Sequence, residues 1–105
     1  MKAMKLPGVA FALVLWAANA LATDAPAIEI KKFVFAPNEI TVSPGTKIVW
    51  TNHDETPHAI AGDGNIKSKA MDTDDRFEYT FATEGDFHYF CTLHPFMTGI
   101  VHVRK

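Results

Sequence analysis

The sequence predicts an all-β domain, either a sandwich or a barrel. Apolar and polar residues alternate with a period of two in several short segments, and turn-forming residues separate these segments at short intervals. After the first 22 residues, no segment has the apolar spacing of an amphipathic helix. The length of 105 residues fits one domain.

We expect residues 1–22 to be a cleavable signal peptide rather than part of this domain. Two lysines lie in residues 1–5, a continuous apolar run follows at 9–18, and Ala20 and Ala22 occupy the positions that a signal peptidase reads. The run is shorter than the roughly 20 apolar residues of a spanning helix, although an uncleaved anchor is the alternative. The division is therefore a signal peptide at 1–22 and a mature domain at 23–105, exported to the periplasm.

The first expected strands precede a clear turn. Residues 27–35 (AIEIKKFVF) are apolar with a charged interruption and are interpreted as one strand, and residues 39–42 form a short one. Ser43, Pro44 and Gly45 are a turn signal, because proline fixes φ and glycine permits positive φ. Residues 46–51 (TKIVWT) are β-branched or aromatic and predict the next strand.

The second half of the chain continues the pattern. Residues 57–61 are a brief extended piece, 62–75 are polar and mostly loop, and 83–86 are another turn. Residues 76–81, 86–91 and 100–104 alternate as strands do. The side chains expected to face inward from these three strands are Phe77, Tyr79, Phe81, Phe87, Tyr89, Cys91, Val101 and Val103.

The charge of the mature domain excludes one class of partner. When Lys2 and Lys5 leave with the signal peptide, ten basic residues become eight against twelve acidic ones, a net charge of about −4. Nucleic-acid binding requires a basic face, so we expect no nucleic acid. We also expect a monomer without stable membrane association after cleavage, able to dock on a partner with a positive patch.

The single cysteine predicts a metal. A domain of this size buries a limited core and is marginal without a further constraint. Cys91 is the only cysteine and cannot form an internal disulfide. A lone thiol in an oxidising compartment is a liability unless it is occupied, and a metal ion would occupy it and stabilise the fold.

Candidate donors follow the cysteine at a regular spacing. Cys91, His94 and Met97 are three residues apart, and a compact loop can turn all three toward one point. Pro95 restricts the conformation of His94. His58, which precedes a short apolar stretch, is the best candidate for a fourth donor. Gly99 is expected to let the chain turn into the last strand.

The donor types indicate copper. Two imidazoles, one thiolate and a thioether form the set found in blue-copper electron-transfer sites, with one ion that cycles between Cu(I) and Cu(II). Phe96, Phe90 and the prolines are expected to close the site. No position is then left open for a substrate, so we do not expect an enzyme.

Taken singly, these residues have ordinary interpretations, and other candidates keep theirs. Cys91 alone could be a small buried hydrophobic residue, and Met97 alone could fill the core. Their joint occurrence with the two histidines favours the metal. The remaining candidates are expected to be surface histidines, a buried methionine in a loop, and a solvated turn or docking patch: His53, His88 and His102; Met71; and Asp72, Asp74 and Asp75.

Three stretches together resemble the cupredoxins, and within them the amicyanin and small plastocyanin-like branch. The stretches are FVFAPNEITVSPGTKIVWTN, TNHDETPHAI and FEYTFATEGDFHYFCTLHPFMTGIVHV, and the gap of two residues between His94 and Met97 is the short-loop spacing of amicyanins. The resemblance implies a Greek-key β-sandwich with copper at one end. It also implies that His94 lies near the surface in an apolar ring that includes Pro95, Phe96 and Pro57.

The sequence departs from the family at two places. Many relatives have asparagine where this chain has Ala59, and that asparagine ties the first histidine's segment to the loop after the cysteine. We therefore expect the two copper-bearing segments to lack this tie. Residues 62–71 are short compared with amicyanins that serve methylamine dehydrogenase, so that partner is not carried over.

Three functions compete. The leading hypothesis is a soluble periplasmic electron shuttle whose redox partners, dehydrogenase or cytochrome c-like proteins, dock near His94, Pro95 and Phe96. The alternative is a periplasmic protein for copper delivery or buffering, although the chain has no methionine-rich tract. An enzyme related to multicopper oxidases or nitrite reductases would need further histidine clusters, and no His-x-His pair is present.

Overall fold

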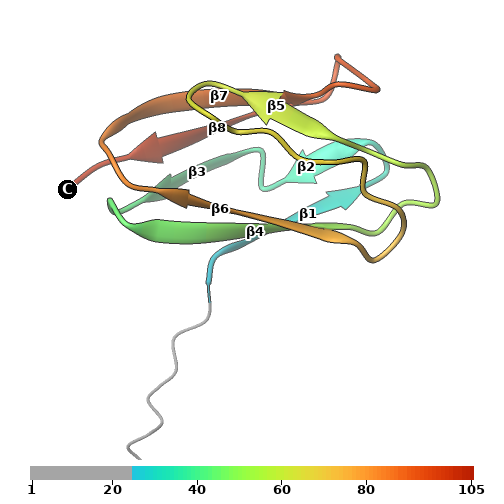
Figure 1. The fold of residues 1–105 in the computed structure, drawn as a ribbon, viewed down its shortest axis with the longest axis horizontal. Helices are drawn as coiled ribbons and strands as arrows, with labels where there is room; N and C mark the ends of the chain where they lie inside the picture. The colour runs from blue at the N-terminus through green and yellow to red at the C-terminus, as the bar shows by residue number, and fades with distance from the viewer. Residues whose placement is uncertain (1–24) are drawn as a thin grey trace, which may run out of the picture.

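Two four-stranded sheets pack face to face in the computed structural model, which describes residues 25–105 (Figure 1). The predicted signal peptide lies outside the described residues. The strands are β1 (Ala27–Lys31), β2 (Val34–Ala36), β3 (Glu39–Val42), β4 (Thr46–Asn52), β5 (Ile60–Gly62), β6 (Arg76–Phe81), β7 (Gly85–Cys91) and β8 (Thr98–Val103). Residues 25–105 contain no helix, and hence none that could cross a membrane. The all-β prediction is confirmed.

The sheets mix parallel and antiparallel pairs. The first sheet has the order β2-β1-β4-β6 and the second β3-β8-β7-β5. β1 pairs with β4 in parallel, and β3 pairs with β8 in parallel, whereas the other neighbours are antiparallel. This arrangement brings the β1–β2 turn, the β4–β5 connection and the β7–β8 connection to one end of the sandwich (Figure 1).

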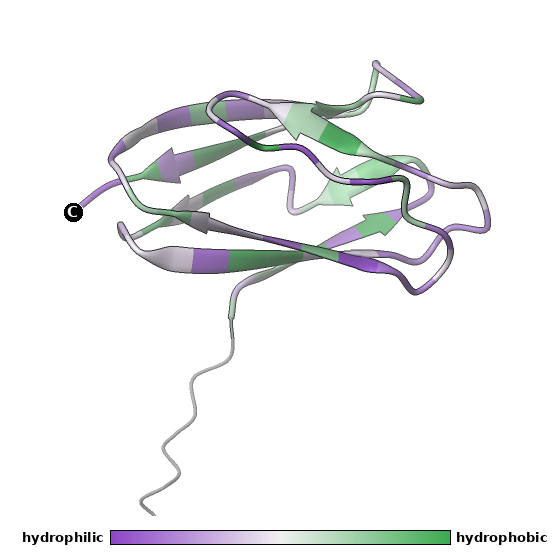
Figure 2. Cartoon of the chain, viewed as in Figure 1, coloured by the Kyte–Doolittle hydropathy of each residue, from purple (hydrophilic) through white to green (hydrophobic). Residues whose placement is uncertain are grey.

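The core lies between the sheets because alternate residues of each strand point inward. Figure 2 shows the resulting alternation of hydrophobic and hydrophilic positions along β7. Trp50 of β4 is fully buried and packs against the rings of Phe77 and Tyr89 at 5.5 and 5.4 Å. Burying a large apolar side chain contributes roughly 1.5–3 kcal/mol, so Trp50 stabilises the packing of the two sheets.

One predicted strand is a hairpin. Residues 27–35 were expected to be continuous, but β1 ends at Lys31 and the chain reverses so that Ile30 pairs with Phe35. Lys32 and Phe33 form the turn, with φ of 55° and 62°. Positive φ at both central positions is typical of a type I′ hairpin turn, which usually contains glycine or asparagine. Neither is present here, so the sequence carried no turn signal.

The last strand begins earlier than predicted. β8 starts at Thr98, so Gly99 lies inside a strand and does not turn the chain. Gly99 pairs with Tyr89, and a Cβ at Gly99 would lie 2.3 Å from the tyrosine ring. Glycine is therefore required here by the close approach of the tyrosine, which fills the space under β8.

Candidate metal centre

Backbone hydrogen bonds fold the loop after β7 into a compact turn. Cys91, the last residue of β7, donates its amide to the carbonyl of Met97 at 3.0 Å. The amides of His94 and Met97 donate to the carbonyls of Cys91 and His94, at 3.3 and 2.9 Å. These bonds turn residues 91–97 back on themselves, as the spacing of three predicted.

The segment that carries His58 is fixed beside this loop. His58 and Met71 exchange backbone hydrogen bonds at 3.1 and 2.7 Å, and Ile60 pairs with Cys91 where β5 meets β7. The amide of Thr92 donates to the carbonyl of Ala59 at 2.8 Å. Ala59 cannot make the side-chain tie that asparagine makes in relatives, as expected, but the backbone joins the two segments by a bond that needs no asparagine side chain.

Three donor atoms converge at this end of the sandwich. Cys91 Sγ lies 3.6 Å from His58 Nδ1 and 3.6 Å from His94 Nδ1, and the two imidazole nitrogens are 3.2 Å apart. Among residues 25–105, His58, Cys91 and His94 form the group of side chains that could hold a metal ion, with one donor atom from each within 4.8 Å of the others. His58 and Cys91 are fully buried, and His94 is half-buried.

The spacing fits a single transition-metal ion. An ion about 2.0 Å from nitrogen and about 2.3 Å from sulfur has flat trigonal donors about 3.5–3.7 Å apart. The triangle formed here has nearly these dimensions. Two imidazoles with a thiolate are the planar donors of a blue-copper site. Met97, the candidate axial donor, is 2% exposed and belongs to the same core cluster as Cys91.

Asp54 determines which nitrogen of His58 faces the cysteine. His58 Nε2 lies 2.9 Å from Asp54 Oδ2, so this nitrogen carries the proton and donates it to the carboxylate. Nδ1 is then left with a free lone pair toward Cys91. Desolvation raises the pKa of Asp54, but the backbone amides of Phe33 and Lys32 and the His58 imidazole outweigh it and lower the pKa below its ordinary value.

An aromatic side chain that the sequence did not indicate covers the two histidines. The Phe33 ring lies edge-on to His58 and His94, with centroids 5.2 and 4.8 Å away, and stacks on Phe96 at 6.5 Å. The prediction that Phe90 closes the site is wrong, because the residue points to the outer face of its sheet. The sequence did not point to Phe33, because this residue lies in a turn within residues 27–35, which the sequence predicts to be one strand.

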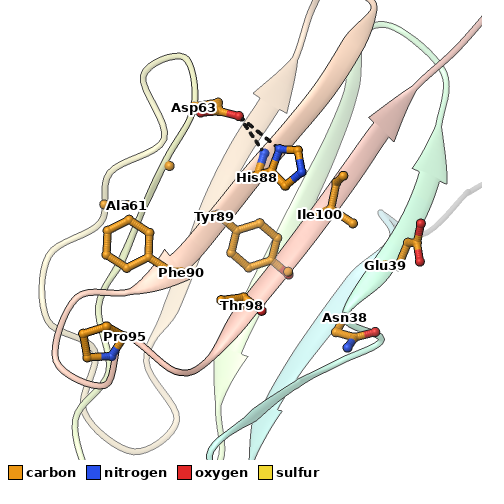
Figure 3. Close-up of a pocket in the computed structure, with 12 residues that line it drawn as sticks. Asn38, Glu39, Ala61, Asp63, His88, Tyr89, Phe90, Pro95, Thr98 and Ile100 are labelled. Carbon is orange, nitrogen blue, oxygen red and sulfur yellow. Dashed lines mark hydrogen bonds and ion pairs between the residues drawn. The ribbon is translucent and has the colours of Figure 1, made fainter.

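Phe90 instead lines a groove of about 700 Å³ over β7 and β8. Figure 3 shows it beside Ala61 and Pro95, with Asp63 reaching His88 farther along. None of the converging donors lines this groove. His88 and His53 are exposed, and Met71 is buried in the core, as predicted.

The sequence is similar to those of known copper-binding proteins. Residues 22–104 match the family model of copper-binding proteins of the plastocyanin/azurin family. The chain is 33% identical to amicyanin of Paracoccus versutus over 94 residues, which cover 84% of this chain and 71% of that protein. It is 31% identical to amicyanin of Paracoccus denitrificans over 95 residues, covering 85% and 72%.

Solved structures agree in fold. The crystal structure of Paracoccus versutus amicyanin superposes with a TM-score of 0.73 at 32% identity, covering 81% of this chain and 86% of that one. A Cu(I) form of an amicyanin variant gives a TM-score of 0.74 at 27% identity, covering 81% and 87%.

Proposed function

Because this chain belongs to the plastocyanin/azurin family of copper-binding proteins, in its amicyanin branch, we propose that His58, Cys91, His94 and Met97 hold its copper ion for one-electron transfer. The observation that carries the proposal is the convergence of three donor atoms within 3.2–3.6 Å of one another. Copper bound there supplies a Cu(I)/Cu(II) couple.

The surrounding residues favour transfer by keeping the donors in place. Buried His58 and Cys91 exclude water from two corners of the triangle. Asp54 holds the His58 ring, and the bond from Thr92 to Ala59 fixes the loop against its neighbour. A donor set that is held in advance needs little rearrangement when its charge changes, which suits an electron carrier.

His94 is the proposed exit for the electron. It is half-buried in the β7–β8 loop, between Phe33 and Phe96, whereas the other two converging donors are fully buried. The surrounding surface is apolar: Phe96 is 72% exposed, and Val34 and Leu93 are about half exposed. An exposed apolar patch of this kind is typical of a site where partners dock.

The proposed partners are periplasmic redox proteins, either a dehydrogenase or a cytochrome c-like protein, that dock over His94, Pro95 and Phe96. An acidic run is joined to the segment of Asp54, which bonds His58, because Thr73 Oγ1 donates to the carbonyl of Asp54 at 2.7 Å. Asp72 and Asp74, which flank that threonine, are exposed. They could steer a basic partner toward the docking surface.

Adding Cu(II) to the domain of residues 23–105 tests the site. The proposal expects an intense visible absorption that a reductant bleaches, and its loss in Cys91→Ser, whose hydroxyl cannot replace the soft thiolate. His53→Ala is the matched control and should keep the colour, because His53 is exposed and bonds Glu29 outside the donor triangle. Colour that persists in Cys91→Ser would refute the assignment. A second measurement tests the alternative, copper delivery. Delivery would be favoured if the reduced protein released its copper to a Cu(I) chelator within seconds.

A further inference from the structure

The turn between β1 and β2 is held by a side chain from another segment. Asp54 Oδ1 accepts the amide of Lys32 at 2.7 Å, and Oδ2 accepts the amide of Phe33 at 3.0 Å. Both turn residues have left-handed φ without being glycine. This conformation costs roughly 1–2 kcal/mol for each such residue and persists where surrounding contacts enforce it. The carboxylate supplies those contacts.

The same carboxylate orients a proposed copper ligand. Its Oδ2 atom also accepts the proton of His58 Nε2 at 2.9 Å. Asp54 is itself fixed on both sides: its amide donates to Asn52 Oδ1 at 2.8 Å, and its carbonyl accepts Thr73 Oγ1 at 2.7 Å. Fully buried Asn52 donates in turn to the carbonyl of Met71 at 2.9 Å. The backbone of Asp54 is therefore fixed by contacts outside the turn. Its carboxylate determines where the turn lies, and not the reverse.

The hydrogen bonds of Asp54 connect the buried His58 with the turn that carries Phe33. The turn carries the Phe33 ring, which contacts both His58 and His94. His58 is thus held from two directions, by the Asp54 carboxylate at Nε2 and by the aromatic edge contact. Because Asp54 also determines where the turn lies, it governs both restraints.

We infer that Asp54 is a positioning residue that couples the copper ligand to the docking surface: its carboxylate fixes the His58 tautomer and holds the Lys32–Phe33 turn that places Phe33 over His58 and His94. The inference rests on the proposed copper site. It makes Phe33 part of a structure that extends from a buried donor to the exposed ring of Phe96. A change at Asp54 therefore alters ligand and surface together.

Substituting Asp54 disrupts both functions in a predictable way. Asp54→Ala removes the acceptor from the turn and from His58. Loss of a carboxylate that orients a metal-binding histidine lowers metal affinity about 10–100-fold, and we expect that loss here. In the copper-free protein, amide hydrogen exchange at Lys32 and Phe33 should accelerate at least tenfold, and the nitrogen chemical shifts of His58 should move toward a mixture of tautomers.

Asp54→Asn keeps the shape of the side chain. It therefore still tests the inference if Asp54→Ala does not fold. An amide has one oxygen and one NH₂ group, whereas all three of its neighbours here are N–H donors. Either orientation opposes a donor to a donor, at Lys32 in one and at Phe33 and His58 in the other. Both orientations should accelerate exchange in the turn, and the second should also shift the His58 tautomer.

Asp63→Ala is the matched control. Asp63 Oδ2 accepts the backbone amide of His88 at 2.9 Å and lies 3.4 Å from its ring nitrogen. It therefore makes contacts of the same kind away from the donor triangle. This variant should leave copper affinity, the His58 shifts and exchange at Lys32 unchanged.

Lys32→Gly separates the two roles of Asp54, which are to hold the turn and to orient His58. Glycine adopts the left-handed conformation without strain, so Lys32→Gly in the Asp54→Ala background should slow exchange in the turn again. Copper affinity should stay low, because His58 still lacks its acceptor. Full recovery of affinity would show that Asp54 acts through the turn alone and would overturn the inference, as would unchanged His58 shifts in both Asp54 variants. The exchange and tautomer measurements use copper-free protein, so they remain decisive even if the wild type gives no blue colour and the proposed function fails.

Discussion

Met97 is expected to tune the copper site rather than retain the ion. A thioether is a weak axial donor, and three stronger donors already converge without it. Met97→Gln places an amide oxygen there, which favours Cu(II) over Cu(I). A tenfold preference corresponds to about 59 mV for one electron, so we expect the reduction potential to fall by about that amount or more while copper stays bound. Voltammetry with a copper assay measures both.

Met71→Leu is the control for this change. Met71 is also buried, and its backbone pairs with that of His58, but it packs in the core cluster as the sequence predicted for a loop residue. Its replacement by an apolar residue of similar size should leave the potential unchanged. Complete loss of copper from Met97→Gln would contradict the tuning role.

At the residue scale, the sequence selected the candidate donors, including His58 at 33 residues from Cys91, but missed the side chains that hold them in place. Cys91, His94 and Met97 lie within one loop, so their spacing and donor types were sufficient to select them as candidates. Asp54 and Phe33 were missed because they act through contacts between segments 21 or 22 residues apart. An aspartate in a polar turn and a phenylalanine in an apparent strand have ordinary interpretations, and only the fold brings them together.

At the element scale, one histidine joins three strands of the second sheet. His102 on β8 bonds Asp86 of β7 at 2.8 Å through Nδ1 and Glu39 of β3 at 2.6 Å through Nε2. Hydrogen bonds to Asp86 and then Glu39 raise the pKa of His102 above its ordinary value of 6.5. Bonds from His102 and Arg104 lower the pKa of Asp86 below 3.8. The charged network therefore stabilises the end of the sheet remote from the copper site.

This network predicts a specific dependence on pH. A raised pKa in the folded state gives stabilisation that is complete below pH 6.5 and is lost as the pH rises through the folded value. His102→Gln should therefore reduce the free energy of unfolding most at about pH 5.5–6.5, and the difference from wild type should shrink at higher pH. Urea unfolding of both proteins from pH 5.5 to 9 measures this, and His88→Gln on the same sheet face is the control. A difference that stayed constant with pH would contradict the assignment to His102.

Strand prediction succeeded where alternation and turn residues agreed. β6 matches its predicted range, and β4 and β7 differ from theirs by one residue at one end. It failed at residues 27–35, because the Lys32–Phe33 turn is stabilised by a carboxylate 21–22 residues away and not by a local glycine. The turn that the sequence could not indicate is the one that carries Phe33 to the site.

At the scale of the whole molecule, the surface around His94 should control exchange with partners. Phe96 is 72% exposed and contacts the His94 ring at a centroid distance of 6.2 Å. Phe96→Glu leaves the proposed donors in place, so the colour should remain while electron exchange with a small basic cytochrome slows about tenfold, or about 1.4 kcal/mol. Phe90→Glu is the control, because Phe90 is an exposed aromatic on the outer sheet face. Slowing by Phe90→Glu alone would move docking to that face.

The acidic run predicts how this exchange depends on salt. Screening shortens the range of charge interactions from about 10 Å at 0.1 M ionic strength to about 3 Å at 1 M, so steering of a basic partner should weaken as salt rises. Asp72 and Asp74 are exposed beside the segment that carries Asp54, whereas Asp75 Oδ2 accepts the amide of Asp72 and stabilises the turn. The double variant Asp72→Asn, Asp74→Asn should therefore lower the association rate at low salt and flatten its salt dependence, with the turn intact. Stopped-flow mixing of each protein with a basic cytochrome, at ionic strengths from about 0.02 to about 1 M, measures the association rate and its salt dependence. If the double variant kept the wild-type salt dependence, the steering charges would have to lie elsewhere on this net acidic domain.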